Sequence, residues 1–354
     1  MFQLQRPKPG LLGIDISTAA VKLLELSRDK AGLIRVEACA VAPLAPGAIV
    51  DRTVANVELL GDALKAVVKQ SGTRLKTAAV AVPTSAVITK IITMPASLGD
   101  DELELQIELE ADRYIPYPLD EVSLDFEVQG PNARNAELMD VLIVASRKEN
   151  VDDRLAALDL AGLRAGVVDV ESYALENAFS VMLEQLPEHG AGQTTAIADV
   201  GATMMTLDVV HDGRSVYVRE QGFGGKELTE EIQSKYGLSF AEAGLAKKLG
   251  GLPESYLEEV LDPFRQAMAR QINVSLQFFR SSGANRQLDR LLLAGGCAQI
   301  RGIREYLETA LEIPTLIADP FAGMALANRI KAPTLRAEAP ALMVACGLAL
   351  RSFD

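Results

Sequence analysis

The sequence predicts an α/β protein built from two similar lobes. At 354 residues the chain is too long for one simple hydrophobic core. Both halves begin with a short apolar strand that carries one Asp near its end, Asp15 in 11–16 and Asp199 in 194–200. The two Asp residues lie about half the chain length apart, which is the spacing expected of a duplicated domain.

The same succession of elements follows each Asp. Small residues predict a turn, and alternating apolar and polar residues then predict two strands joined by a second turn. These strands are 21–26 and 33–41 in the first half, and 204–210 and 215–221 in the second. This repeated unit is the main basis of the two-lobe prediction.

Periodicity predicts the remaining elements. The predicted strands are 77–82, 87–94, 122–128, 138–145, 291–294 and 315–318, and the predicted helices are 54–70, 100–114, 149–160, 224–236, 239–249, 254–281 with a bend at Pro263, 300–311 and 339–350. Segment 100–114 is a choice between two patterns, because its leucines alternate with acids as in a strand. A capping box from Ser97 to Asp100 and a stripe of apolar residues at helical spacing favour the helix.

These elements group into four expected regions. The first lobe core is 11–84, 166–192 and 339–354; an inserted subdomain is 85–165; the second lobe core is 193–225 and 285–338; and a helical subdomain of the second lobe is 226–284.

The composition excludes several classes of partner. A net charge of -13 argues against nucleic acid and against direct adhesion to an anionic membrane. No apolar run reaches the ~18 residues of a membrane span, and residues 1–9 lack the apolar segment of a signal peptide. We therefore expect a cytoplasmic protein in which any association with a membrane runs through a partner.

Cysteine and histidine are too sparse for several kinds of site. Cys39, Cys297 and Cys346 match no metal-binding or redox spacing, and we expect buried, reduced thiols. His189 and His211 lie in loop-like sequence. They give no support to Ser-His-Asp catalysis or to a His-based metal site.

The two repeated strand ends are the main candidates for chemistry. Asp15 and Asp199 would place two carboxylates at the mouth of a cleft between the lobes. Mg²⁺ takes hard oxygen ligands and keeps most of its waters, so opposed carboxylates together with ATP phosphates suit it. The turns that follow offer hydroxyls and backbone N–H groups that suit phosphate oxygens, at Ser17, Thr18, Gly201 and Thr203. For either Asp alone, the alternative is a turn or capping residue.

Three further segments have a functional and a structural interpretation each. Glu171, between a strand and a helix, is placed to orient an attacking water, or it simply stabilises a helix N-terminus. Gly295 and Gly296 follow an apolar strand and would let adenine and ribose approach the backbone, or they form a tight turn. Residues 222–225 open a helix and would present N–H groups to an anion, or they act as a flexible joint.

Taken in order, these segments resemble the five-part nucleotide signature of the actin-like (ribonuclease H-like) ATPase superfamily. The matching segments are 15–18 and 199–203 for the two phosphate motifs, Glu171 and 345–347 for the two connecting motifs, and 293–296 for the adenosine motif. Within this superfamily the chain is similar to the PilM family of type IV pilus assembly proteins, which are relatives of FtsA. Segments 12–17, 114–118 and 224–229 and the position of the 85–165 insertion carry this resemblance over nearly the whole chain.

The resemblance implies a duplicated actin-like fold with an FtsA-type inserted subdomain that holds ATP and Mg²⁺ between its lobes. It implies that Asp15 and Asp199 hold the metal, that Glu171 and Asp199 position water and metal, and that ATP hydrolysis is slow at most. The implied nucleotide contacts are Asp15, Ser17, Thr18, Gly201, Thr203, Gly225, Lys247, Gly295 and Gly296. This chain has Gly244 where the family usually has a Glu, a departure that bears on nucleotide affinity.

The family also implies partners. Its members are adaptors that bind the cytoplasmic N-terminal tail of a PilN-type inner-membrane protein and so connect the pilus platform to its motor. The implied docking groove lies on the insertion near Tyr114, Pro116 and Tyr117.

Two rival functions share the same fold. A small-molecule kinase would need a catalytic Asp in a polar, Gly-rich loop, whereas the insertion is apolar and acidic. A filament-forming actin-like ATPase of the FtsA type would need a basic amphipathic C-terminal helix, whereas the sequence ends Arg351-Ser352-Phe353-Asp354.

Overall fold

A computed structural model describes residues 10–283 and 286–354 of the chain. Its strands are β1 (Leu12–Ile16), β2 (Ala20–Arg28), β3 (Ile34–Pro43), β4 (Ile49–Val50), β5 (Thr53–Val54), β6 (Thr77–Val82), β7 (Val87–Pro95), β8 (Val122–Asn132), β9 (Asn135–Arg147), β10 (Arg164–Val170), β11 (Thr194–Val200), β12 (Met204–His211), β13 (Arg214–Gly222), β14 (Arg290–Ala294), β15 (Thr315–Ile317) and β16 (Ala325–Leu326). Its α-helices are α1 (Val57–Ser71), α2 (Asp100–Ala111), α3 (Lys148–Leu160), α4 (Glu171–Ser180), α5 (Gly225–Tyr236), α6 (Phe240–Leu249), α7 (Asp262–Ser281), α8 (Ile303–Leu311), α9 (Ala332–Glu338) and α10 (Met343–Leu350).

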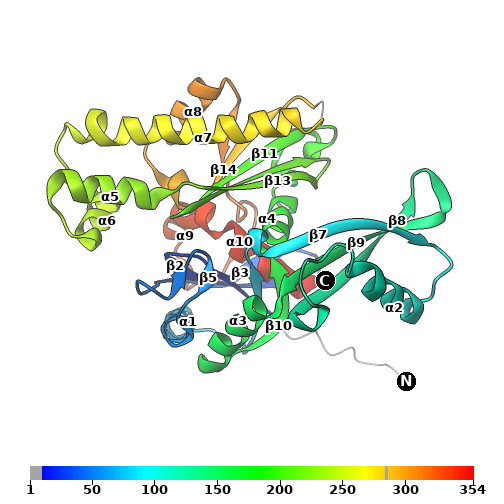
Figure 1. The fold of residues 1–354 in the computed structure, drawn as a ribbon. Coiled ribbons are helices and arrows are strands. Elements are labelled where there is room, and N and C mark those ends of the chain that lie inside the picture. Colours follow the sequence, from blue (N-terminus) through cyan, green and yellow to red (C-terminus); the bar gives the residue numbers. More distant parts are fainter. Residues whose placement is uncertain (1–9, 284–285) are drawn as a thin grey trace.

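Two sheets of matching topology form the two halves of the molecule (Figure 1). The first has the order β10-β6-β1-β2-β3-β16, and the second has the order β13-β12-β11-β14-β15. In the first sheet β1, which carries Asp15, pairs antiparallel with β2 and parallel with β6. In the second sheet β11, which carries Asp199, pairs antiparallel with β12 and parallel with β14. The predicted duplication is therefore confirmed, with β16 as an extra edge strand on the first sheet.

Two helices lie between the sheets and join them into one core. Figure 1 shows α4 and α10 in this position, and their buried side chains pack against residues of both sheets. Leu175 and Phe179 of α4 belong to the same cluster as Leu24 of β2 and Ile197 of β11. A helix with apolar residues on all sides is expected in such a position, and seven of the eight residues of α10 are buried.

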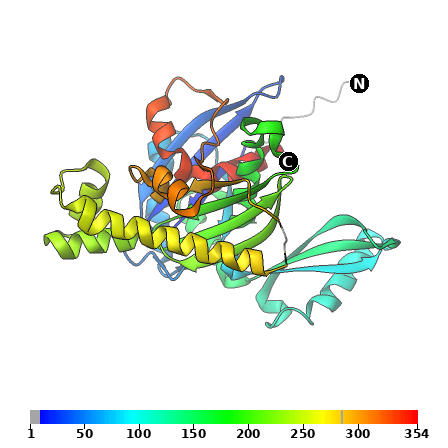
Figure 2. The ribbon, with the colours of Figure 1, turned by 90° about the horizontal axis from the view of Figure 1, so that it is seen from above.

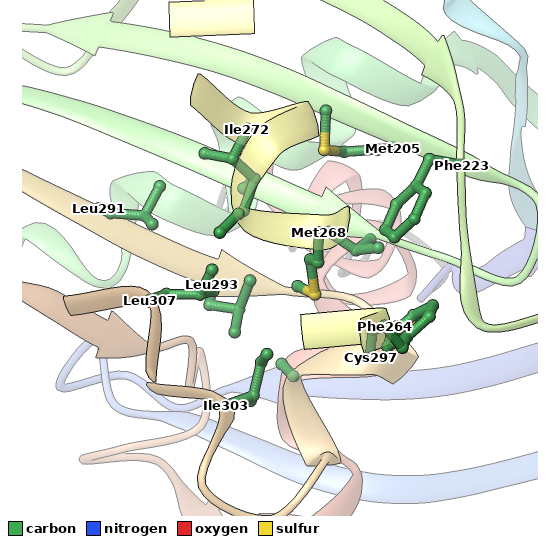
Figure 3. Close-up of a cluster of buried hydrophobic side chains, with 14 of the residues drawn as sticks. Met205, Phe223, Phe264, Met268, Ile272, Leu291, Leu293, Cys297, Ile303 and Leu307 are labelled. Atoms are coloured by element: carbon green, nitrogen blue, oxygen red, sulfur yellow. The ribbon is translucent and has the colours of Figure 1, made fainter. Parts of the chain in front are cut away.

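The outer face of the second sheet is covered by α7 and α8. Figure 3 shows Met268 and Ile272 of α7 on the side of Leu291 and Leu293 of β14, and Phe264 of α7 next to Cys297. The apolar residues of α7 recur at helical spacing and bury one stripe of the helix, as an amphipathic surface helix requires.

The insertion forms a separate small sheet with the order β7-β9-β8. Leu103 and Ile107 of α2 pack on its face against Ile92, Val141 and Ile143. This unit extends away from both main sheets, on the side opposite α5 and α6 (Figures 1 and 2).

Several predicted boundaries differ from the structure for identifiable reasons. The cap of α2 is Gly99 with Glu102, whose side chain accepts from the Gly99 N–H, and not the predicted pair Ser97 and Asp100. Helix α1 begins at Val57 because Asn56 caps it through Leu59 N. The predicted helix 254–281 divides into a π-helical turn, Leu257–Leu261, and α7, because Pro263 has no N–H to continue the α-helical pattern.

The prediction missed short elements that lack a periodic signal, namely the hairpin β4–β5, strand β16 and helix α9. Cys297 and Cys346 are buried and Cys39 is partly buried, and all three are free thiols as predicted. Among the described residues, no helix combines the length and apolar character that a membrane crossing requires. Residues 1–9, for which the absence of a signal peptide was predicted, and the boundary at 285 lie outside these residues.

Candidate functional site

The two repeated turns meet in the structure. The Thr18 and Thr203 hydroxyls, one from each turn, are hydrogen-bonded with an Oγ1–Oγ1 distance of 3.1 Å. Both turns are closed in the same way, by Ser17 N donating to Ala20 O and by Gly201 N donating to Met204 O. The Ser17 hydroxyl also donates to Ala20 O (2.9 Å). The fold therefore places two copies of one turn in direct contact.

Asp15 is paired with a lysine on the neighbouring strand. Lys22 lies opposite Asp15 in the β1–β2 register, and its Nζ is 2.7 Å from Asp15 Oδ2. Burial alone would lower the pKa of Lys22, but Asp15, Asp199 and Glu171 outweigh it and raise that pKa. A permanent cation therefore stands among the carboxylates at this end of the sheets.

Asp199 occupies the equivalent place on the second sheet. Burial raises the pKa of Asp199 to about 6, with Lys22 acting to lower it and Asp15 to raise it. The two Asp residues thus lie within one electrostatic neighbourhood, as the duplicated sequence predicted.

Glu171 begins α4, as predicted, and forms an ion pair with Arg52 of the β4–β5 hairpin. The Arg52 guanidinium also lies 3.1 Å from a carboxylate oxygen of Glu220 on β13. Burial raises the pKa of Glu171 to about 7, and Arg52 opposes this shift. A carboxylate that titrates near neutrality can accept a proton from water.

The glycines after β14 lie against Asp199. Gly295 has φ 80°, and a Cβ there would lie 2.4 Å from Asp199 Oδ1, so only glycine fits. Gly296 is exposed and faces open space. The backbone at Gly296 is therefore accessible to a planar group. The absence of a side chain at Gly295 lets this turn pack closely against β11.

The start of α5 is bound to the second turn. Gly225 N donates to Gly201 O (3.0 Å), and Lys226 N donates to Ala202 O (2.8 Å). Both N–H groups therefore already donate hydrogen bonds to acceptors within the protein. Lys247 of α6 donates to Gly225 O (2.8 Å) and Thr229 Oγ1 (2.6 Å), and burial lowers its pKa. Two of the predicted nucleotide contacts, Lys247 and Gly225, therefore lie beside each other.

Gly244 lies one helical turn before Lys247 and faces Thr229 of α5 at 4.0 Å. A Cβ at this position would meet no close atom, and the absence of a Glu leaves the α5–α6 pair with one acid fewer at this end.

A cavity of about 170 Å³ at the base of the insertion is lined by one of the three predicted partner-binding residues. Tyr117 lines it, and so does the buried Ile115. Its lining also includes Ser85, Arg147 and Asn150. Tyr114 is an exposed residue beside Lys90, whose Nζ lies 5.4 Å from its ring centroid, and Pro116 is exposed.

The sequence analysis missed three charged residues of the site: Lys22, Arg52 and Glu220. Lys22 lies between apolar residues in the first half of β2, which is a usable signal for a buried charge with a partner. Arg52 and Glu220 lie in segments without any motif, and only folding brings them to Glu171.

The described residues hold no group of three or more His, Cys, Asp or Glu side chains arranged for a metal ion. A metal cage made of protein alone is therefore absent from the part of the chain that the structure describes. Mg²⁺ prefers a ligand set of one or two carboxylates that is completed by phosphate oxygens and waters.

Comparison with known proteins gives the same fold. A solved structure titled "PilM-PilN type IV pilus biogenesis complex" is similar at 28% identity and a TM-score of 0.83, covering 98% of this chain and 100% of that chain. Ethanolamine utilization protein EutJ from Carboxydothermus hydrogenoformans is 16% identical, with a TM-score of 0.55 and coverage of 98% and 90%. MreB5 of Spiroplasma citri bound to ADP is 14% identical, with a TM-score of 0.50 and coverage of 97% and 95%. EutJ and MreB5 are similar in fold alone.

The chain also matches the family described as type IV pilus assembly protein PilM over residues 13–353. Since this match spans nearly the whole sequence, the protein belongs to the type IV pilus assembly protein PilM family.

Proposed function

We propose that this protein is a nucleotide-binding adaptor of pilus assembly. In this proposal Mg-ATP binds between the two sheets, and the cytoplasmic N-terminal tail of a PilN-type inner-membrane protein binds the cavity of the insertion. The protein is then cytoplasmic and reaches the membrane and the pilus motor through such partners. In this proposal the two lobe cores keep the bounds expected from the sequence, 11–84 with 166–192 and 339–354, and 193–225 with 285–338, except that β16 joins the first sheet.

The observation that carries the ATP site is the contact between Thr18 and Thr203, which brings two phosphate-type turns and two carboxylates together. Lys22 supplies a cation for the phosphates, and Gly295 and Gly296 supply an open backbone for the base. Asp15 and Asp199 would hold Mg²⁺ through water, and a bound Mg²⁺ would offset the negative charge that gathers there. MreB5, which is similar in fold, is bound to ADP in its solved structure, and this supports nucleotide binding as the role of the fold.

Calorimetry with Mg-ATP tests this site. The wild-type protein is expected to bind, and ligand at 100 times Kd would stabilise it by about 2.7 kcal/mol. Asp199→Asn removes a carboxylate without changing its shape, so the affinity for Mg-ATP should fall at least about tenfold, or ~1.4 kcal/mol. The control is Asp208→Asn on the adjacent strand β12, which should leave the affinity unchanged. Equal affinities of wild type and Asp199→Asn would refute the site.

The cavity of the insertion suits one side chain of a peptide. A cavity of similar size, ~150 Å³, accepts benzene in another protein. Apolar residues, Ile88, Ile115 and Val122, form part of the lining, and Ser146, Arg147 and Asn150 add polar groups. This mixture suits an extended peptide that inserts an apolar side chain and hydrogen-bonds its backbone. The structure of a PilM-PilN complex, similar over the whole chain, supports a PilN-type protein as the source of that peptide.

Peptide binding is expected to depend on Tyr117 and not on Tyr114. Both side chains are 41% exposed, but only Tyr117 lines the cavity, 5.6 Å from Arg147 by its ring centroid. Tyr117→Ala should weaken binding of the partner's N-terminal peptide about tenfold, as for a contact at an interface centre. Tyr114→Ala makes the same chemical change outside the cavity and should alter Kd less than about twofold. Fluorescence polarisation with labelled peptide measures both, and equal losses would remove the cavity from the proposal.

A further inference from the structure

The β4–β5 hairpin carries Arg52 into the candidate site on a strained turn. Its two central residues, Asp51 and Arg52, have φ of 47° and 67°, which is the left-handed region that non-glycine residues seldom adopt. The strand pairs Ile49–Val54 and Val50–Thr53 fix this two-residue turn. Strained residues of this kind gather at functional sites, and here the strained residue makes the ion pairs.

Arg52 joins three elements that are far apart in sequence. Its guanidinium bonds Glu171, at the start of the helix between the sheets, and lies 3.1 Å from Glu220 on β13 of the second sheet. The side chains of the three residues are 17%, 21% and 8% exposed in that order. Bulk water therefore screens this triad far less than a surface pair.

The triad has unused hydrogen-bonding capacity. Within residues 10–283 and 286–354, neither Arg52 Nε nor Glu220 Oε2 has a hydrogen-bond partner. Glu220 Oε1 accepts a long bond from Thr206 Oγ1 on β12 (3.4 Å). Two carboxylates are thus held close together mainly by one guanidinium.

We propose that Arg52 is an electrostatic latch that holds the two lobes together and keeps Glu171 ion-paired. The latch controls the access of Mg-ATP to the site between the two sheets. This regulatory role rests on the proposed function. Without the Arg52 cation, Glu171 and Glu220 repel each other across the lobes, and the closed arrangement loses its bridge. Removing one partner of a partly buried pair leaves an uncompensated charge, which is the costly case.

Distances between spin labels test the latch without any ligand. Labels at Asp62→Cys on α1 and Glu230→Cys on α5 lie on exposed side chains of opposite lobes. Cys39→Ala removes the partly buried thiol, and the other two thiols, Cys297 and Cys346, are buried away from the labelling reagent. The readout is the distance distribution by double electron–electron resonance.

Arg52→Asn removes the cation and keeps a residue that tolerates left-handed backbone. Arg52→Asn should increase the population of molecules with a longer distance between the two labels, in which the lobes are apart, at least about tenfold. Glu220→Gln keeps the shape of the side chain and should have the same effect. Asp51→Asn is the control, because it changes the other left-handed residue of the same turn and leaves Arg52 in place. The double variant Arg52→Asn with Glu220→Gln should open no further than Arg52→Asn alone, because both remove one interaction.

An unchanged distribution in Arg52→Asn and Glu220→Gln would overturn the latch, as would additive opening in the double variant. If Arg52→Asn does not fold, as judged by circular dichroism, Glu220→Gln and its comparison with Asp51→Asn decide the question. Mg-ATP binding is measured separately on wild type. A wild type that fails to bind would refute the proposed nucleotide site but leave the result on the latch intact.

Discussion

Gly347→Ala is expected to destabilise the protein by about 3 kcal/mol or more, the upper range for an overfilled core. Gly347 lies on α10 where that helix crosses α4, and a Cβ there would lie 1.7 Å from the Ala174 carbonyl oxygen. The obstacle is backbone, so no side-chain rotation relieves it and the two helices must separate. Both helices pack on both sheets, so the damage would extend to the whole core.

The measurement is thermal unfolding against a matched helical control. Gly244→Ala on α6 adds the same methyl group where the nearest atom is 4.0 Å away, and it should stabilise by about 0.5–1 kcal/mol through helix propensity. Opposite signs for the two Gly→Ala changes would support the close crossing of α10 and α4. A Gly347→Ala protein as stable as wild type would show that α10 does not approach α4 as described.

Asp208→Asn is expected to stabilise the protein increasingly as the pH rises from 5 to 8. Asp208 on β12 is fully buried, and Ser215 Oγ donates to its Oδ1 at 2.6 Å, while Oδ2 has no partner among the described residues. Burial raises its pKa from 3.8 to about 7, with Ser215 opposing and Glu176 adding to the shift. The folded protein therefore keeps this proton where the unfolded chain has lost it.

The sign follows from proton linkage. Between pH 4 and 7 the native state binds more protons at this position than the unfolded state, so native stability falls as the pH rises through this range. Asn cannot ionise, and the stability difference between variant and wild type should grow by about 2–3 kcal/mol from pH 5 to pH 8. Urea unfolding at several pH values measures it.

Glu171 and Asp199 also have raised pKa values and contribute slopes of the same sign in wild type, so only the difference between variant and wild type isolates Asp208. Asp62→Asn, at an exposed position on α1 with a side chain 71% exposed, is the control and should show no pH-dependent difference. A constant difference for Asp208→Asn across this pH range would contradict a neutral buried Asp208.

Local pattern was sufficient for the parts of the site that belong to the repeat. Asp15 and Asp199 each stand one residue before the end of an apolar strand, and the alternation of the next two strands fixes how each sheet continues. Since the same short unit folds the same way twice, the sequence alone determined the two matching sheets, the turns at Thr18 and Thr203, and the glycines after β14. The family resemblance followed from these local features in order.

The tertiary structure alone decided which charges meet. Arg52, Glu171 and Glu220 come from a short hairpin, a helix start and an edge strand, and nothing local distinguishes Arg52 or Glu220 from solvent-exposed charges. Likewise, the sequence shows Gly347 only as one of several small residues in an apolar helix, and its close contact with α4 is visible only in the tertiary structure. Ion pairs and helix crossings depend on distances between segments remote in sequence, whereas strands, turns and caps depend on neighbours along the chain, so sequence pattern predicts the second kind and not the first.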